Sequence, residues 1–186
     1  MDLNEDDKVD VSDYRAILLK FNPVCAMKTT TNGYFYVPNV ATDLLKIEML
    51  FDNQNITGDQ TDGTSPYSSI QNYPDRKVDM KDLRFVCEIF GLLEGQSGWD
   101  YMADLYPDRK IDMKDIRTAS KNFGKNGTYI NSTNPQWLSG VTITFSTGEE
   151  KLPDSYGFVT IPQGATNFTV KRNSTPIGAM IIFWEL

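Results

Sequence analysis

Histidine is absent from the 186 residues, and cysteine occurs only twice. Without histidine the chain lacks the residue that most often acts as a general base and as a zinc ligand. Ser-His-Asp sites, Cys-His sites and most zinc sites are therefore excluded. Cys25 and Cys87 are too few for a disulfide scaffold. They either form one bridge in an exported protein or serve as two buried apolar residues, and the sequence leaves both alternatives open.

Long apolar runs and an excess of basic residues are also absent. No segment reaches the ~18 apolar residues of a membrane-spanning helix, so we expect no transmembrane segment. The formal net charge is -7. This acidity argues against nucleic acid and anionic membranes as partners, because both select for basic patches. An acidic chain suits bound cations, although acidic surfaces also aid solubility.

The chain nevertheless has features of an exported protein. No signal peptide precedes Asp2, and the chain opens inside a motif, so we expect a mature or trimmed product whose export signal is missing. Five Asn-x-Ser/Thr triplets indicate an extracellular or cell-surface location and are candidate N-glycan sites. These triplets begin at Asn55, Asn126, Asn131, Asn167 and Asn173.

An internal repeat is the clearest signal in the chain. The segment 73–84, YPDRKVDMKDLR, recurs at 106–117 as YPDRKIDMKDIR. Ten of the 12 positions are identical, and the offset is 33 residues. A more distant copy, at 2–13, opens the chain. A chance match of this length is excluded, so we expect one structural unit that is used three times.

Each copy contains a loop in which oxygen-bearing groups alternate. Ca²⁺ takes six to eight oxygen ligands, and a 12-residue loop supplies them from positions 1, 3, 5, 7, 9 and 12, with a backbone carbonyl at position 7. The first loop offers, in this order, Asp2, Asn4, Asp6, Lys8, Asp10 and Asp13. The third loop offers Asp104, Tyr106, Asp108, Lys110, Asp112 and Asp115. The middle loop offers Gln71, Tyr73, Asp75, Lys77, Asp79 and Asp82. The expected Ca²⁺ affinity therefore falls from the first loop to the third and then to the middle loop.

The alternative interpretation is that these acids only cap helices. Asp13, Asp82 and Asp115 each precede an apolar-periodic stretch and would make good N-caps. Capping needs one acid per helix, whereas the first loop has acids or amides at alternate positions. Metal binding is therefore favoured, most strongly for the first loop and least for the middle loop.

A short helix is expected after each loop, because apolar residues recur there at helical spacing. The expected helices cover 14–21, 83–90 and 116–123. Gly91 and Gly124 stand where helix-ending glycines occur. The repeated unit is therefore a loop followed by a helix, with no helix before the loop.

This loop-then-helix unit resembles the F-hand repeat of type I dockerin modules. The matching residues are Asp-x-Asn-x-Asp-x-Lys-Val-Asp-x-x-Asp at 2–13 and the Asp-x-Lys-Val/Ile-Asp-x-x-Asp cores at 75–82 and 108–115. The resemblance implies Ca²⁺ at the loop positions named above. It also implies a cohesin-like protein partner that docks onto the exposed helices.

Two departures from the dockerin pattern bear on the site. The loop position usually held by glycine is occupied by Asp7 in the first loop, Arg76 in the middle loop and Arg109 in the third. The backbone is therefore either strained at this position or turns differently. Met80-Lys81 and Met113-Lys114 stand where dockerins carry partner-recognition residues. This duplicated pair is compatible with a symmetric binding face, and a solvated helix start is the alternative.

The rest of the chain has the alternation of β-strands. Strands are predicted at 34–37, 45–51, 141–146, 159–161, 168–170 and 179–186, and the last apolar run suits a central strand. Short strands with regular turns predict an α+β protein. In it, an antiparallel β-sandwich, with a jelly roll as the narrower expectation, is combined with the dockerin-like repeats.

Strands on both sides of the paired repeats indicate an insertion. We expect an isolated repeat at 1–22, a first β segment and polar loop at 23–69, the paired repeats at 70–124 and a β-sandwich segment at 125–186. The second and fourth segments would form one discontinuous domain. Asp59 and Asp62 in the polar loop are either ion ligands or ordinary loop residues, and the latter is favoured.

Three functions fit these patterns. The first is a non-enzymatic extracellular structural or assembly subunit that self-associates and whose loops are stiffened by Ca²⁺. The second is a docking module with a cohesin-like partner. The third is a carbohydrate-binding sandwich, in which Trp99, Tyr101, Trp137 and Trp184 would stack on sugars, with core packing as the alternative role. An enzyme is not expected, because metal ligation accounts for the paired acids and no nucleophile with a base partner is present.

Overall fold

The computed structural model describes residues 23–28, 33–51, 58–59, 75–131 and 136–185. The first predicted repeat, at 1–22, lies outside the described residues with its six candidate ligands. Gln71 and Tyr73 of the middle loop lie outside them as well. The structure therefore bears on the ligand predictions for the middle and third loops.

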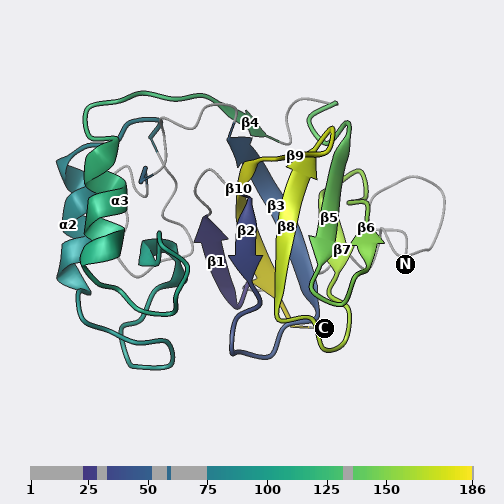
Figure 1. Ribbon diagram of the computed structural model, residues 1–186, viewed down its shortest axis with the longest axis horizontal. Helices are drawn as coiled ribbons and strands as arrows, with labels where there is room; N and C mark the ends of the chain where they lie inside the picture. The colour runs from purple at the N-terminus through teal and green to yellow at the C-terminus, as the bar shows by residue number, and fades with distance from the viewer. Residues whose placement is uncertain (1–22, 29–32, 52–57, 60–74, 132–135, 186) are drawn as a thin grey trace, which may run out of the picture.

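The described strands form two five-stranded antiparallel sheets (Figure 1). The first sheet has the order β1-β10-β3-β4, with β7 also paired to β3. Its strands are β1 (Cys25–Lys28), β10 (Gly178–Trp184), β3 (Leu44–Phe51), β4 (Tyr129–Asn131) and β7 (Phe158–Thr160). The second sheet has the order β2-β8-β5-β6, with β9 also paired to β8. Its strands are β2 (Tyr34–Tyr36), β8 (Asn167–Arg172), β5 (Val141–Phe145), β6 (Glu150–Lys151) and β9 (Thr175–Pro176). The expected β-rich α+β class is confirmed, and the jelly-roll connection stays a prediction.

The two sheets pack face to face around an apolar core. Ile47 and Ile181 of the first sheet share a buried cluster with Phe145 and Phe168 of the second. The Phe168 ring has neighbours in both sheets, with centroid distances of 5.6 Å to Phe145 and 6.2 Å to Phe183. Because side chains alternate across a strand, this core accounts for the period of two that predicted the strands.

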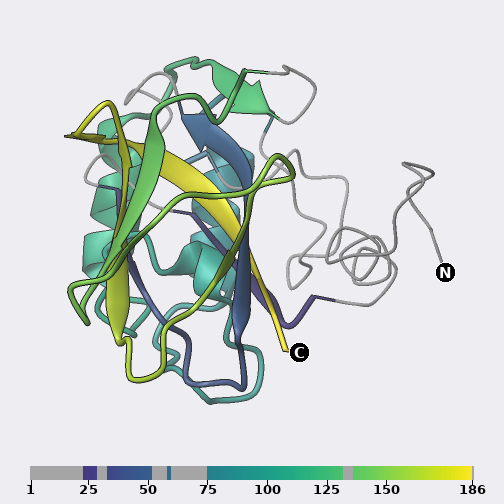
Figure 2. The same cartoon turned by 90° about the vertical axis from the view of Figure 1, so that its right-hand side faces the viewer.

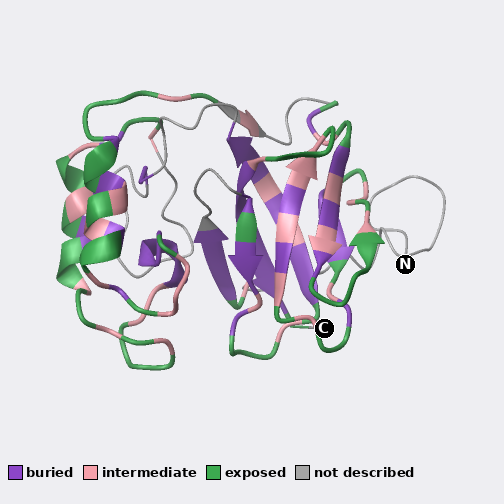
Figure 3. Cartoon of the chain, viewed as in Figure 1, coloured by how far each residue is buried: buried purple, intermediate pink, exposed green. Residues whose placement is uncertain are grey.

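β10 is buried on both faces (Figure 3). It lies between β1 and β3 within its sheet. Ile181 and Phe183 belong to the core between the sheets, whereas Ile182 and Trp184 belong to a second apolar cluster on the helical side. A strand that is covered on both faces needs a continuous apolar run. The prediction that the final run forms a central strand is confirmed.

A β-bulge in β3 changes which of its residues face which core. The register against β10 slips by one residue at Glu48. Ile47 therefore faces the core between the sheets, whereas Met49 and Phe51 belong to the cluster on the helical side. The alternation predicted over 45–51 is wrong beyond Ile47, because one extra residue moves every later side chain to the other face.

The helical segment is inserted between β3 and β4, which pair directly with each other. It contains α2 (Met80–Glu88), a short 3-10 helix η2 (Tyr101–Ala103) and α3 (Met113–Lys121). The helices α2 and α3 lie side by side in Figure 1 and stand behind the strands in the turned view of Figure 2. Both helices begin earlier than expected and end before Phe90 and Phe123, whose side chains are exposed.

The two described repeats pair with each other reciprocally. Gly91, which follows α2, donates its N–H to the carbonyl of Ile111 at 2.8 Å. Gly124, which follows α3, donates its N–H to the carbonyl of Val78 at 2.7 Å. One isolated β-bridge extends each of these pairings. The 33-residue offset relates each contact to its counterpart, so the sequence repeat is also a pseudo-twofold of the structure.

Other expectations concern cysteines, aromatic residues and membrane spans. Cys25 is buried and Cys87 is exposed, and both are free, so the pair fits neither alternative drawn from the sequence.

Tyr101, Trp137 and Trp184 are buried, as core packing requires. Within the described part of the chain, no helix has the length and apolar character needed to cross a membrane.

Phe183→Ala should lower the free energy of unfolding by about 3–5 kcal/mol, because it leaves a cavity where the two sheets meet. Leu152→Ala, at a residue that is 73 % exposed, is the control and should change it by less than about 0.5 kcal/mol. Urea denaturation followed by circular dichroism measures both values. Similar losses in the two variants would contradict this assignment of the core.

Candidate metal centre

The third loop has a buried carboxylate at each end. Asp104 follows η2, and Asp115 is the third residue of α3. The Asp115 carboxylate accepts hydrogen bonds from the backbone N–H groups of Tyr106, at 2.8 Å, and of Asp112, at 2.7 Å. One carboxylate therefore ties the early part of the loop to its end.

Asp104 organises the turn in the middle of the loop. Its carboxylate accepts the backbone N–H groups of Asp108, at 3.3 Å, and of Arg109, at 2.9 Å. Lys114 forms an ion pair with Oδ2 of Asp108. The other oxygen of Asp108, Oδ1, is buried and has no hydrogen-bond partner within the described structure. Such an atom is costly unless a cation or a water reaches it.

The two buried carboxyl groups of the third loop have raised pKa values. Burial, together with the nearby Asp115 carboxylate, raises the pKa of Asp104 to about 7. Burial also raises the pKa of Asp115, and the carboxylates of Asp108 and Asp112 add to this effect. Buried acids close to one another disfavour their own ionised forms unless a cation lies between them. A hard divalent ion with oxygen ligands is the group that would meet this need.

The middle loop repeats the contacts of the third. Asp82 is buried and accepts the backbone N–H of Asp79 at 2.8 Å. Lys81 forms an ion pair with Asp75 at 3.1 Å. Residues 33 positions later make the same two contacts in the third loop. The duplication therefore extends from the sequence to the polar contacts of the loops.

The helix caps differ from the capping alternative drawn from the sequence. The N-cap residues are Asp79 and Asp112, at position 9 of each loop. Asp82 and Asp115 are the third helical residues and accept the N–H of the N-cap, which completes a capping box. Their interpretation as N-caps is wrong, because the helices begin three residues earlier than the apolar periodicity indicated.

Asp59 takes the place in the middle loop that Asp104 has in the third. Asp59 is only 2 % exposed, and its Oδ1 accepts the backbone N–H of Asp75 at 3.2 Å. In the third loop, Oδ1 of Asp104 accepts the equivalent N–H, from Asp108, at 3.3 Å. The interpretation of Asp59 as an ordinary polar loop residue does not fit this buried position.

A fixed loop length hid this residue in the sequence. Asp59 precedes Asp75 by 16 residues, whereas the equivalent residues of the third loop are four apart. A 12-residue count therefore placed Gln71 at position 1. The sequence held one local signal that this acid lies in a close-packed place, because Gly58 directly precedes Asp59. A Cβ at Gly58 would lie 2.6 Å from Cα of Ala119, so this acid follows a tight contact with α3.

Arginine holds the loop position at which glycine is usual, and it adopts the conformation that favours glycine. The backbone φ is 72° at Arg76 and 66° at Arg109. Of the two alternatives drawn from the sequence, strain and a different turn, the structure has the strained left-handed turn. This conformation costs a non-glycine residue about 1–2 kcal/mol.

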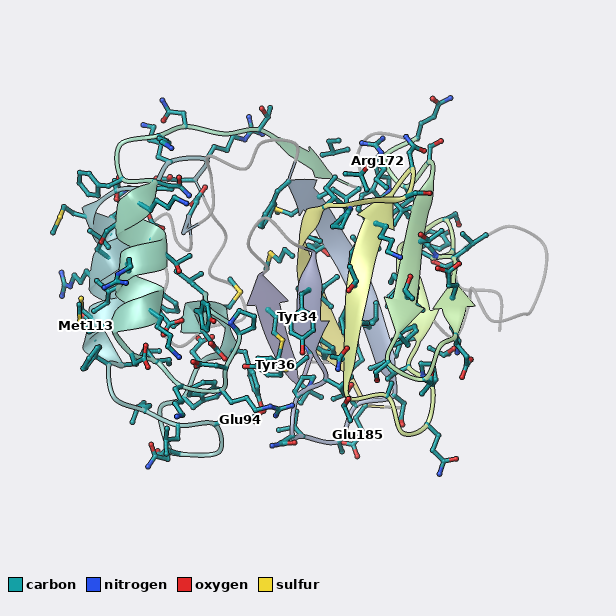
Figure 4. The ribbon with its side chains drawn as sticks, viewed as in Figure 1. Tyr34, Tyr36, Glu94, Met113, Arg172 and Glu185 are labelled. Carbon is teal, nitrogen blue, oxygen red and sulfur yellow. The ribbon has the colours of Figure 1, made fainter. Side chains whose placement is uncertain are left out.

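The third loop also contacts the second sheet at Tyr36, which Figure 4 labels on β2 with Glu94 close by. Tyr36 of β2 donates its hydroxyl hydrogen to Oδ2 of Asp104 at 2.7 Å. The guanidinium of Arg109 lies over the Tyr36 ring, 4.4 Å from its centroid. Arg109 also forms an ion pair with Glu94, which accepts the backbone and side-chain N–H groups of Asn39, both at 2.9 Å. These five residues are called the clasp below.

In the described parts of the middle and third loops, the carboxylates do not form a finished set of metal ligands. Among the described residues, no group of three or more acidic or cysteine side chains is arranged to hold a metal ion. At position 5, a lysine holds one carboxylate oxygen in each loop, since Lys81 is paired with Oδ2 of Asp75 and Lys114 with Oδ2 of Asp108. Ion binding in these loops would therefore require the lysines to move away.

Comparison with protein-family models gives no match, and searches of curated proteins and of solved structures give none either. The dockerin-like resemblance therefore rests on the repeated motif itself.

Glu94→Gln should reduce the sensitivity of the fold to acid. Burial acts to raise the pKa of Glu94, but hydrogen bonds from Asn39 and Tyr101 and the contact with Arg109 outweigh it and hold this pKa below the ordinary value of 4.5. The charged group therefore stabilises the fold above about pH 4.5, and its contribution is lost as the pH falls through the folded-state pKa.

The variant should be less stable than the wild type by about 2 kcal/mol at pH 7, and this difference should shrink below the folded-state pKa. Urea denaturation at a series of pH values measures it. Glu149→Gln, at an exposed acid, is the matched control. A difference that stays constant across the series would contradict the role of the Glu94 charge.

Proposed function

We propose that the paired loops bind Ca²⁺ and that the chain is a non-enzymatic extracellular structural or assembly subunit whose loops Ca²⁺ makes rigid. The observation that carries this proposal is the duplicated placement of buried carboxylates. Asp104 and Asp115 in the third loop have equivalents in Asp59 and Asp82. A donor set of carboxylates and carbonyls favours a hard cation such as Ca²⁺.

The residues that would hold each ion follow from the loop positions. In the third loop they are the carboxylates of Asp104, Asp108, Asp112 and Asp115, with the backbone of Tyr106 and Lys110. In the middle loop they are the carboxylates of Asp59, Asp75, Asp79 and Asp82, with the carbonyl of Lys77. Bound Ca²⁺ would supply the positive charge that the buried carboxylates lack. Lys81 and Lys114 have half-exposed side chains, so that each ammonium group could turn into solvent when the ion enters.

A second candidate function is docking onto a cohesin-like partner, which the dockerin-like resemblance implies. One observation favours it. Met80 and Met113 begin α2 and α3 at equivalent positions, and they are 65 % and 59 % exposed. Figure 4 shows Met113 on the outer side of its helix. Large exposed apolar side chains that are repeated by a pseudo-twofold suit a symmetric contact with another protein.

The carbohydrate-binding alternative has less support. Trp137 and Trp184 are buried in the two apolar clusters, and Tyr101 is buried beside them. Aromatic rings that bind sugars have to present a face to solvent. The aromatic residues proposed for stacking therefore serve chiefly as core residues.

Millimolar Ca²⁺ should raise the melting temperature relative to the chelated protein by roughly 5–10 °C. A ligand that binds only the folded state contributes about 2.7 kcal/mol at 100 times its Kd, and each kcal/mol shifts Tm by about 2–4 °C at this chain length. Asp59→Asn and Asp108→Asn should each remove a large part of the increase. Differential scanning calorimetry with about 10 mM CaCl₂ or with EDTA measures it.

Glu149→Gln is the matched control, since it removes an exposed acid far along the chain from both loops and should keep the full increase. If the wild-type protein showed the same Tm in both buffers and no heat of Ca²⁺ binding, the proposed function would be refuted. An unchanged increase in Asp59→Asn alone would remove Asp59 from the ligand set.

Light scattering during a Ca²⁺ titration should separate the two candidate functions. An assembly subunit should grow into larger particles, with a scattered intensity that rises with protein concentration. A docking module should keep the mass of a monomer, because its partner is a different protein. A constant mass across the Ca²⁺ range would therefore favour docking over self-assembly.

A further inference from the structure

We propose that the third loop is a cation-dependent joint, in which Tyr36 of the second sheet positions the ligand Asp104, so that Ca²⁺ binding and docking of the sandwich favour each other. The proposal rests on the Ca²⁺ binding proposed above. It adds a positioning residue from outside the repeats and a consequence for how the repeats are attached.

Asp104 is shared between the loop and the sandwich. Its Oδ2 accepts two hydrogen bonds, from the Tyr36 hydroxyl at 2.7 Å and from the Arg109 N–H at 2.9 Å. Its Oδ1 accepts the longer bond of 3.3 Å, from the N–H of Asp108. The Tyr36 ring is buried, so its hydroxyl is held in place. A fixed donor on Oδ2 restrains the carboxylate and leaves Oδ1 available to an ion, as partners of metal ligands commonly do.

Arg109 links the turn of the loop to the same strand. Its backbone N–H holds Asp104, while its side chain covers the Tyr36 ring and donates to the carbonyl of Val37 at 3.2 Å. The side chain also reaches Glu94, which holds the backbone just beyond β2. At position 109 this set of contacts gives the arginine side chain a role that glycine could not fill. A rearrangement of the loop turn would therefore break contacts with the sandwich.

The middle loop provides an internal comparison. Arg76 has the same left-handed backbone conformation as Arg109, but its side chain is exposed. In the middle loop, Asp59 takes the place of Asp104, and it comes from the segment before the loop. The joint is thus a property of the third loop. By linkage, a docked sandwich should strengthen Ca²⁺ binding there by the same factor by which Ca²⁺ strengthens docking.

Tyr36→Phe tests the proposal, because it removes the hydroxyl and keeps the ring under Arg109. A CaCl₂ titration of the full chain followed by ¹H–¹⁵N NMR reports the third loop through the amide at position 109 and the middle loop through the amide at position 76. The variant should raise the Kd at position 109 about tenfold, and the Kd at position 76 should change less than twofold. Tyr34→Phe, at a residue of the same strand that is 38 % exposed, is the matched control and should leave both Kd values unchanged.

Each outcome of the titration is decisive. If Ca²⁺ shifts both amides and the Kd at position 109 is the same in Tyr36→Phe and the wild type, the joint is refuted and Ca²⁺ binding stands. If about 10 mM CaCl₂ shifts neither amide in the wild type, Ca²⁺ binding and the joint fail together. Should Tyr36→Phe not fold, Arg109→Lys keeps the charge and loses the planar contacts. Arg109→Lys should raise the Kd for Ca²⁺ at position 109 and not at position 76. Arg76→Lys is its control.

Discussion

The first sheet is apolar on both faces, and the arrangement of the whole molecule depends on this double burial. One face packs against the second sheet, and the other packs against the helical insert. Such a sheet is stable in water only if the second sheet and the helical insert both pack against it. Each face that lacked its packing partner would expose a row of large apolar side chains. The insert is therefore a structural layer as well as the carrier of the loops.

This constraint also fixes where the loops lie relative to the sandwich. The cluster on the helical side includes Leu105 and Ile111 of the third loop, together with Trp184 of β10. The third loop is thus anchored in two ways: its apolar residues pack on the first sheet, and the clasp joins it to β2 of the second sheet. A metal centre in this loop would be held by packing that the ion itself does not provide, which is the usual requirement for a well-organised site.

Much of this architecture could be predicted from the sequence, because apolar alternation and a repeated motif are local patterns. The six predicted strands lie within two residues of their expected bounds, whereas β1, β4, β6 and β9 were not predicted and both helices begin earlier than the apolar spacing indicated. The bulge at Glu48 could not be foreseen, since one extra residue in a strand leaves no mark in composition. Asp59 was assigned to a polar loop because a contact across 16 residues violates the fixed spacing on which motif reading depends. The clasp joins Tyr36 to Asp104, which lies 68 positions later, and only the fold brings these residues together.

The direct pairing of β3 with β4 has a consequence for the order of folding. Their register joins Phe51 to Tyr129, so that pairing has to close a loop of about 80 residues, which costs roughly 4 kcal/mol of chain entropy. The contacts inside the insert are far more local, since Gly91 meets Ile111 only 20 residues along the chain. Short-range contacts of this kind form early, and once formed they shorten the path that the two strands have to search. The insert is therefore placed to act as the nucleus from which the sandwich closes.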